Sequence, residues 1–163
     1  MHRTYAVRDI DEGEELTISY VDILAPYHER QHRLRTSLGF ECSCERCSLD
    51  PADRDASDDA LRIISEIEDE LGDFGSQEAS PELAEELLAL YEDEGLQGRI
   101  GGAYTLAALN YALAGMEKET RRYATLAAET VGWEYGPQAK DAEAMRELAS
   151  DPRKHWSWGK RRG

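Results

Sequence analysis

Two hydrophobic patterns divide the chain. Near the N-terminus apolar and polar side chains alternate, most clearly over residues 16–20, where Leu16, Ile18 and Tyr20 share one face. A period of two is typical of a half-buried strand. Residues 4–10 show a weaker β pattern, and the polar residues 11–14 indicate a turn between the two segments. The pattern predicts a small β-hairpin or strand pair, which by itself is only marginally stable in water.

Helical periodicity begins near Pro26. A helix is predicted from Pro26 to about Leu38, because proline suits the first turn of a helix and Gly39 is well placed to end it. One stripe of this helix is expected to be buried. It consists of Tyr27, Gln31, Leu34 and Leu38.

An array of about five helices is predicted after a turn at residues 50–53. The expected spans are about 58–71, 80–94, 99–113, 117–131 and 137–149. Alanines on the third and fourth of these helices allow close packing; they are Ala103, Ala107, Ala108, Ala124 and Ala127. This pair has about the length of one tetratricopeptide-type repeat, although a single partial match is weak evidence for a true repeat. Trp156 and Trp158 in the tail are expected to pack back onto the helices.

Charge is distributed very unevenly. The 163 residues carry a formal charge of −15, and residues 50–100 alone hold 17 acidic side chains against Arg54, Arg62 and Arg99. This balance argues against direct nucleic-acid binding. The acidic residues are interpreted as a solvated helix face, or as a docking site for a basic substrate tail. The absence of an export signal or an apolar run of membrane-spanning length predicts an intracellular protein, in the nucleus, the cytoplasm or both.

All three cysteines lie in one short segment, as Cys42-x-Cys44-x-x-Cys47. Thiolates this close repel each other unless a cation neutralises them, and the spacing is typical of structural zinc sites. Inert thiols or a redox C-x-x-C pair are the alternatives. A closed zinc site needs about four ligands, so water or a histidine is expected to complete this one. His28 and His32, four residues apart on the predicted helix, are the nearest candidates, although their position among Arg30, Arg33 and Arg35 favours a solvated basic face.

Two motifs in order resemble a known family. The first is Ala6-x-Arg8-Asp9-Ile10-x-x-Gly13-Glu14-Glu15-Leu16-Thr17-Ile18-Ser19-Tyr20, and the second is Phe40-x-Cys42-x-Cys44-x-x-Cys47. Together, over roughly residues 4–48, they resemble the end of a SET domain and its post-SET zinc segment. With helices behind them, the arrangement is similar to the SET-and-MYND (SMYD-like) protein-lysine methyltransferases.

The resemblance implies a role for five residues. Tyr20 matches the tyrosine at the methyl-transfer centre, and Phe40 matches the aromatic residue that packs on the adenine of S-adenosyl-L-methionine. Cys42, Cys44 and Cys47 match three of the four post-SET ligands of Zn²⁺. The implied substrate is a protein lysine, with histones among the candidate proteins. The implied domains are the end of a SET domain (1–25), a helix with the zinc segment (26–50) and a helical C-terminal domain (51–163).

The chain also departs from the family pattern. It lacks the Asn-His-x-Cys segment that supplies the fourth zinc cysteine and cofactor contacts, and it has Leu38 where many relatives carry a second active-site tyrosine. We therefore expect a mainly α fragment of a methyltransferase that does not methylate by itself, so its classification as an enzyme stays open. The alternative is a non-enzymatic helical interaction module with a structural zinc knuckle. An Asn-His-x-Cys segment upstream of Met1 in the reading frame would distinguish the two.

Overall fold

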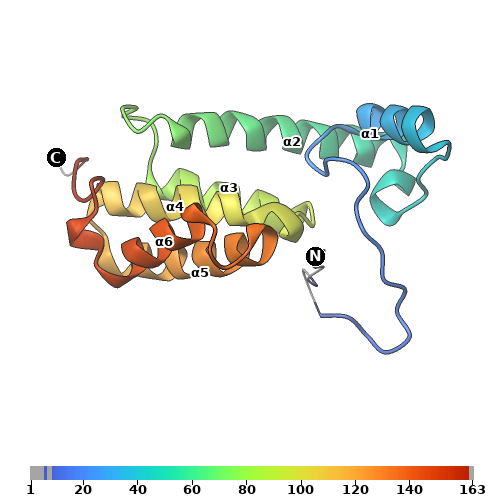
Figure 1. The fold of residues 1–163 in the computed structure, drawn as a ribbon. Coiled ribbons are helices and arrows are strands. Elements are labelled where there is room, and N and C mark those ends of the chain that lie inside the picture. The colour runs from blue at the N-terminus through green and yellow to red at the C-terminus, as the bar shows by residue number, and fades with distance from the viewer. Residues whose placement is uncertain (1–5, 7–8, 162–163) are drawn as a thin grey trace. The chain divides into compact units, whose positions relative to one another are not determined.

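The computed structural model describes residue 6 and residues 9–161, and it is mainly α-helical, as the sequence predicts (Figure 1). These residues divide into an N-terminal unit, residues 9–65, and a C-terminal unit, residues 66–161; the boundary falls within helix α2. The α-helices are α1 (Tyr27–Arg33), α2 (Pro51–Gly72), α3 (Pro81–Asp93), α4 (Ile100–Ala114), α5 (Glu117–Tyr135) and α6 (Lys140–Ser150). A π-helical turn, η1 (Leu34–Leu38), and three 3₁₀ turns, η2 (Glu45–Ser48), η3 (Gln97–Arg99) and η4 (Pro152–Lys154), complete the list.

The predicted β-hairpin does not form in the part of the chain that the structure describes. Residues 16–20 are irregular, and the side chains of Leu16, Ile18 and Tyr20 are 74%, 60% and 64% exposed. A strand needs a neighbour that supplies its hydrogen bonds, and no strand is present within residues 9–161. Apart from Ala6, the first predicted strand up to Arg8 lies outside the described residues. The alternating pattern therefore leaves an extended apolar face that is open to solvent.

The N-terminal unit is held together by contacts to the first half of α2. The backbone N–H of Tyr27 donates to Oδ1 of Asp58 at 2.8 Å, which caps the start of α1. The guanidinium of Arg54 lies 3.9 Å from the centre of the Tyr27 ring. The turn predicted at residues 50–53 is wrong, because Pro51 opens α2 and Asp50 accepts the N–H groups of the next turn. An Asp-Pro pair suits a helix start as well as a turn, because aspartate caps the first N–H groups and proline suits the first helical position.

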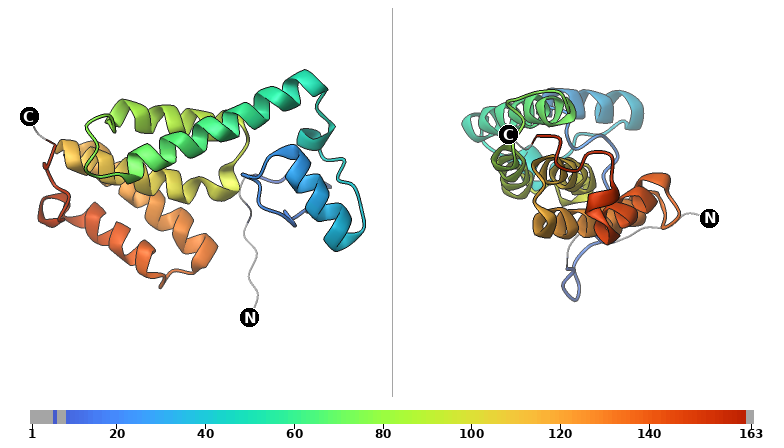
Figure 2. Two further views of the ribbon diagram at one scale, coloured as in Figure 1. Left: turned by 90° about the horizontal axis from the view of Figure 1, so that it is seen from above. Right: turned by 90° about the vertical axis from the view of Figure 1, so that its left-hand side faces the viewer.

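The C-terminal unit is an array in which α3 packs on α4, α4 on α5 and α5 on α6 (Figure 2). Ser80 caps α3 by accepting the N–H of Leu83 at 3.2 Å, as predicted. The five alanines singled out on α4 and α5 are all fully buried, so the backbones of these helices lie close together. Within the described residues, the helices are all too short or too polar to span a membrane.

A cluster of tyrosines links three helices of this array. The rings of Tyr111 and Tyr123 stack with centroids 5.4 Å apart, and both hydroxyls donate to Oε1 of Glu85 at 2.6 Å. Burial and the bond to the Glu85 carboxylate raise the pKa of Tyr123 to about 12. The pKa of Tyr111 is raised by the same two causes. One carboxylate of α3 thus ties together α4 and α5.

Neighbouring glycines of α4 provide a test of the helix spacing. A methyl group at Gly102 meets nothing within 4 Å, whereas one at Gly101 lies 3.2 Å from Cγ2 of the buried Val131 on α5. Alanine is the better helix former, so Gly102→Ala should raise the free energy of unfolding by about 0.5–1 kcal/mol. Gly101→Ala should lower it by about 1 kcal/mol, because a packed interface resists added volume. Urea unfolding measures both variants, and an equal gain in the two would show that α4 and α5 are not tightly packed at this point.

Candidate metal centre

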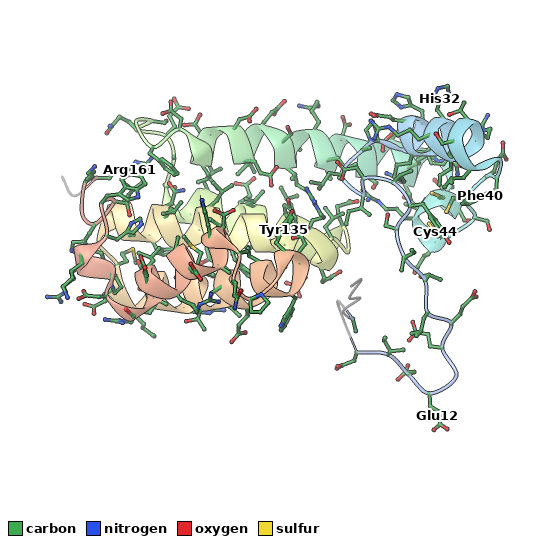
Figure 3. The ribbon with its side chains drawn as sticks, viewed as in Figure 1. Glu12, His32, Phe40, Cys44, Tyr135 and Arg161 are labelled. Atoms are coloured by element: carbon green, nitrogen blue, oxygen red, sulfur yellow. The ribbon has the colours of Figure 1, made fainter. Side chains whose placement is uncertain are left out.

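The three cysteines converge on one point in the N-terminal unit. The chain leaves η1 at Gly39, whose positive φ of 77° suits glycine, and then carries Cys42 and Cys44 into η2, which contains Cys47. The three Sγ atoms lie within 4.8 Å of one another. Cys47 is buried, Cys42 is half-buried and Cys44 is exposed. Figure 3 shows Cys44 at this turn, close below Phe40.

The donor set fits zinc. Two sulfurs that bind one Zn²⁺ at about 2.3 Å lie at most about 4.6 Å apart, so the cluster needs little or no contraction. No histidine or carboxylate among the described residues joins the three sulfurs. His28 and His32 are both exposed and are not part of the cluster. Figure 3 shows His32 on α1, away from Cys44. Neither His28 nor His32 can therefore be the fourth ligand in this conformation. Of the two ligands expected from the sequence, water or a histidine, water is left.

The thiols do not ionise alike. Burial, followed by the neighbouring Cys44 thiolate, raises the pKa of Cys47 to about 11. Burial also opposes ionisation of Cys44, but the backbone N–H of Cys47 and the thiols of Cys42 and Cys47 donate to its sulfur and together lower its pKa. Cys44 therefore has a lower pKa than Cys47, and it is also exposed whereas Cys47 is buried. A cation arriving from solvent meets this thiolate and must displace the proton of Cys47.

The aromatic residues singled out in the sequence lie beside the cluster. The rings of Tyr20 and Phe40 meet edge to face with centroids 6.0 Å apart. Both rings and all three cysteines line one cavity of about 390 Å³, together with Ile18, Arg30 and Leu34 among others. The structure thus brings all five candidate site residues to one cavity, although they are up to 27 positions apart in the sequence. Their chemical roles stay a prediction.

The hydrogen bonds that two polar residues make around the cluster were not predicted from the sequence. Arg46, between Cys44 and Cys47, donates to the carbonyl oxygen of Ile23 at 2.7 Å and to Oγ of Ser57 at 3.3 Å, so it anchors the cysteine turn to its surroundings. Gln31 bonds to the backbone of Cys42 through its side-chain amide. The available signal was the position of Gln31 on the predicted apolar stripe of its helix, where a polar side chain needs a partner.

Comparison with known proteins gives partial matches. No protein-family model matches the chain. Histone-lysine N-methyltransferase SMYD3 of Homo sapiens is 42% identical over 66 residues, which are 40% of this chain and 15% of that protein. N-lysine methyltransferase SMYD2 of Gallus gallus is 42% identical over 50 residues, 31% of this chain and 12% of the relative. Histone-lysine N-methyltransferase SET5 of Scheffersomyces stipitis is 34% identical over 97 residues, 52% of this chain and 20% of the relative.

These matches cover no more than a fifth of the length of each of these relatives. They nevertheless agree on one kind of protein, and the chain has the cysteine cluster and the helical C-terminal region that the resemblance implies. Over part of its length, the chain is homologous to SET-domain methyltransferases of the SMYD and SET5 types.

Proposed function

We propose that the chain contributes the end of a SET domain (residues 1–25), the post-SET zinc segment (26–50) and a helical C-terminal domain (51–163) to a protein-lysine N-methyltransferase. The observation that carries this proposal is the single cavity lined by Tyr20, Phe40 and the three cysteines. The partial matches to histone-lysine and protein-lysine methyltransferases support it. The proposed substrate is accordingly a protein lysine, with histones as the first candidates, and the proposed location is the nucleus or the cytoplasm.

Each site residue has a distinct task in this proposal. Cys42, Cys44 and Cys47 would hold Zn²⁺, which fixes the turn that carries Phe40. Phe40 would pack on the adenine ring of the cofactor, and the Tyr20 hydroxyl would orient the lysine amine for an in-line approach. S-adenosyl-L-methionine supplies the methyl group when it is bound. The centroids of the Tyr20 and Phe40 rings are 6.0 Å apart, so the two side chains lie next to each other in the cavity.

The chain alone is expected to transfer no methyl group. Tyr20 is 64% exposed and Phe40 is 40% exposed, so a further surface is needed to exclude water and enclose the cofactor. A radiolabelled methyl-transfer assay on histones should stay at background, with an active lysine methyltransferase as the positive control. Transfer by this chain that Tyr20→Phe abolishes would overturn the expectation and would instead establish Tyr20 as catalytic.

A second candidate is a helical interaction module without catalysis, in which the zinc turn is purely structural. A groove between α5 and α6 favours it. This groove has a volume of about 600 Å³ and is lined by Trp133, Pro137 and Ala149 among others, and Trp133 is 51% exposed. Exposed tryptophan is typical of protein interfaces. The methyl-transfer assay separates the two candidates when it is repeated with a protein segment that covers Tyr20 and Phe40. If the chain is part of a methyltransferase, activity should appear and should depend on Tyr20. An interaction module should stay inactive.

A further inference from the structure

The side chain of Gln31 makes an unusual pair of hydrogen bonds. It lies on α1 and is only 3% exposed. Its Nε2 donates to the carbonyl oxygen of Cys42 at 2.8 Å, while its Oε1 accepts the backbone N–H of the same residue at 3.1 Å. The two bonds fix the orientation of the amide, since only the nitrogen can donate to the carbonyl. One side chain therefore satisfies the whole backbone of the first cysteine.

This arrangement copies part of a β-sheet. In an antiparallel pair, two opposite residues exchange both of their N–H···O bonds. Here a glutamine side chain, 11 residues earlier in the sequence, takes the place of the neighbouring strand. Two bonds to one residue restrict both its position and its rotation. Cys42 is thereby held in place even though its segment belongs to no sheet.

The preceding residue of α1 is also a buried polar residue beside the cluster. Arg30 is 5% exposed and its Nη1 donates to the carbonyl oxygen of Ala25 at 2.6 Å. Arg30 and Cys47 line the same cavity. Two consecutive buried residues of α1 therefore lie at the cysteine cluster, and Gln31 is the one that bonds to a cysteine. Packing alone would be served as well by leucine at either position, without the cost of burying a polar group.

We propose that Gln31 is a positioning residue of the zinc centre, which fixes the backbone of Cys42 beside the other two cysteines before the metal binds. The proposal rests on the zinc site proposed above and adds how the chain prepares it. A preformed site loses less conformational entropy when it binds its ligand. Partners that orient metal ligands typically contribute a factor of about 10–100 to metal affinity. Zinc binding and the formation of α1 are therefore linked, since each stabilises the other.

The first test compares two neighbouring variants of α1. Zinc affinity is measured by competition with a chelator, and the spectrum of the Co²⁺-loaded protein reports the geometry of the thiolates. Gln31→Leu should weaken zinc binding about 10- to 100-fold and alter the Co²⁺ spectrum. His32→Ala, which changes an exposed side chain outside the cluster, should leave both unchanged. A purely structural Gln31 would lower thermal stability without moving the spectrum, and that result would overturn the proposal.

The second test needs no mutation and avoids variants that fail to fold. In the metal-free protein the amide hydrogen of Cys42 should exchange slowly with solvent, because Gln31 already accepts it, whereas that of the exposed Ser43 should exchange fast. Equal, fast exchange at both residues would show that the two hydrogen bonds between Gln31 and Cys42 form only when metal is bound, and this would overturn the proposal. If the unaltered chain binds zinc and Gln31→Leu binds it equally well, this inference fails alone. If the unaltered chain binds no zinc, both this inference and the proposed zinc site fail.

Discussion

Cys44→Ser is expected to release zinc from the chain and to leave the C-terminal unit folded. The chain offers three clustered sulfurs and no fourth protein ligand among the described residues. Loss of one thiolate therefore leaves two, too few for a stable structural site. A structural zinc site contributes about 10–16 kcal/mol over four ligands, so one ligand is worth roughly 3 kcal/mol, or on the order of a hundredfold in affinity. The exposed position of Cys44 makes a packing defect a poor explanation for such a loss.

Metal analysis of freshly purified protein provides the measurement. We expect about one zinc per unaltered chain and none in Cys44→Ser, with Ser43→Ala as the matched control that retains the metal. Binding should weaken as pH falls, because protons compete for all three sulfurs and Cys47, with its pKa raised to about 11, keeps its proton most firmly. All three tryptophans lie in the C-terminal unit, so its fluorescence should not change. Unaltered protein without zinc and with three freely alkylated thiols would show that the segment is not a metal site.

Arg161→Ala is expected to lower the stability of the C-terminal unit more than the other substitutions proposed for this unit. The Arg161 guanidinium donates to the carbonyl oxygen of Ala79 at 2.9 Å, to Oδ1 of Asn110 at 2.5 Å and to the carbonyl oxygen of Asp73 at 3.1 Å. Asn110 is 1% exposed, so its oxygen would be left without a partner in a dry site. Hydrogen bonds to charged groups contribute about 1.5–3 kcal/mol each, less where water can enter. We expect the free energy of unfolding to fall by about 2–3 kcal/mol.

The tail that carries Arg161 explains why one residue matters so much. The backbone N–H groups of Gly159 and Arg161 donate to the carbonyl oxygens of Ala112 and Leu113 in the last turn of α4, where the helix itself leaves carbonyl groups to be satisfied. The ring of Trp156 meets that of Phe74 in the loop before α3, with centroids 5.4 Å apart, but Trp156 stays 52% exposed and is not packed onto the helices as predicted. The tail thus closes the end of α4 and contacts the loop before α3.

Urea unfolding followed by tryptophan fluorescence tests this prediction, since the signal reports the C-terminal unit alone. Arg161→Lys should recover only part of the loss, because lysine lacks the planar fork that reaches three oxygens. Arg153→Ala is the control: its side chain is 71% exposed and pairs with Glu117 at the surface, where a change of at most about 0.5 kcal/mol is expected. Equal, small losses for Arg161→Ala and Arg153→Ala would contradict the role of the tail.

Local signals in the sequence predicted most of the helices correctly. Ser80 and Pro81 mark the start of α3, and Gly115, with a φ of 71°, marks the end of α4. Such signals act within one helical turn, so they can be read without knowledge of the fold. The same reasoning gave a wrong prediction at Asp50-Pro51, because a turn and a helix start use the same residues and the structure has the helix.

The candidate site was predictable where its members are neighbours in the sequence. Three cysteines within six residues must lie close together in any fold, so the cluster followed from their spacing. The histidine ligand did not, because His28 and His32 lie on the exposed side of α1, and the sequence does not fix which side of a short helix faces the cysteines. The contribution of Gln31 was likewise hidden, although a polar residue on a buried stripe was a usable signal.

The sequence by itself thus determined the helical class, the bounds of most helices and the cysteine cluster, since each depends on residues within a turn or two of one another. Only the tertiary structure decided the rest. Within residues 9–161 it gives residues 16–20 no strand partner, although their alternating pattern requires one. It also placed Gln31 against Cys42 and brought Arg161 to a carbonyl 88 positions earlier. These outcomes depend on which distant groups meet, and a local pattern can show that a group needs a partner without naming it.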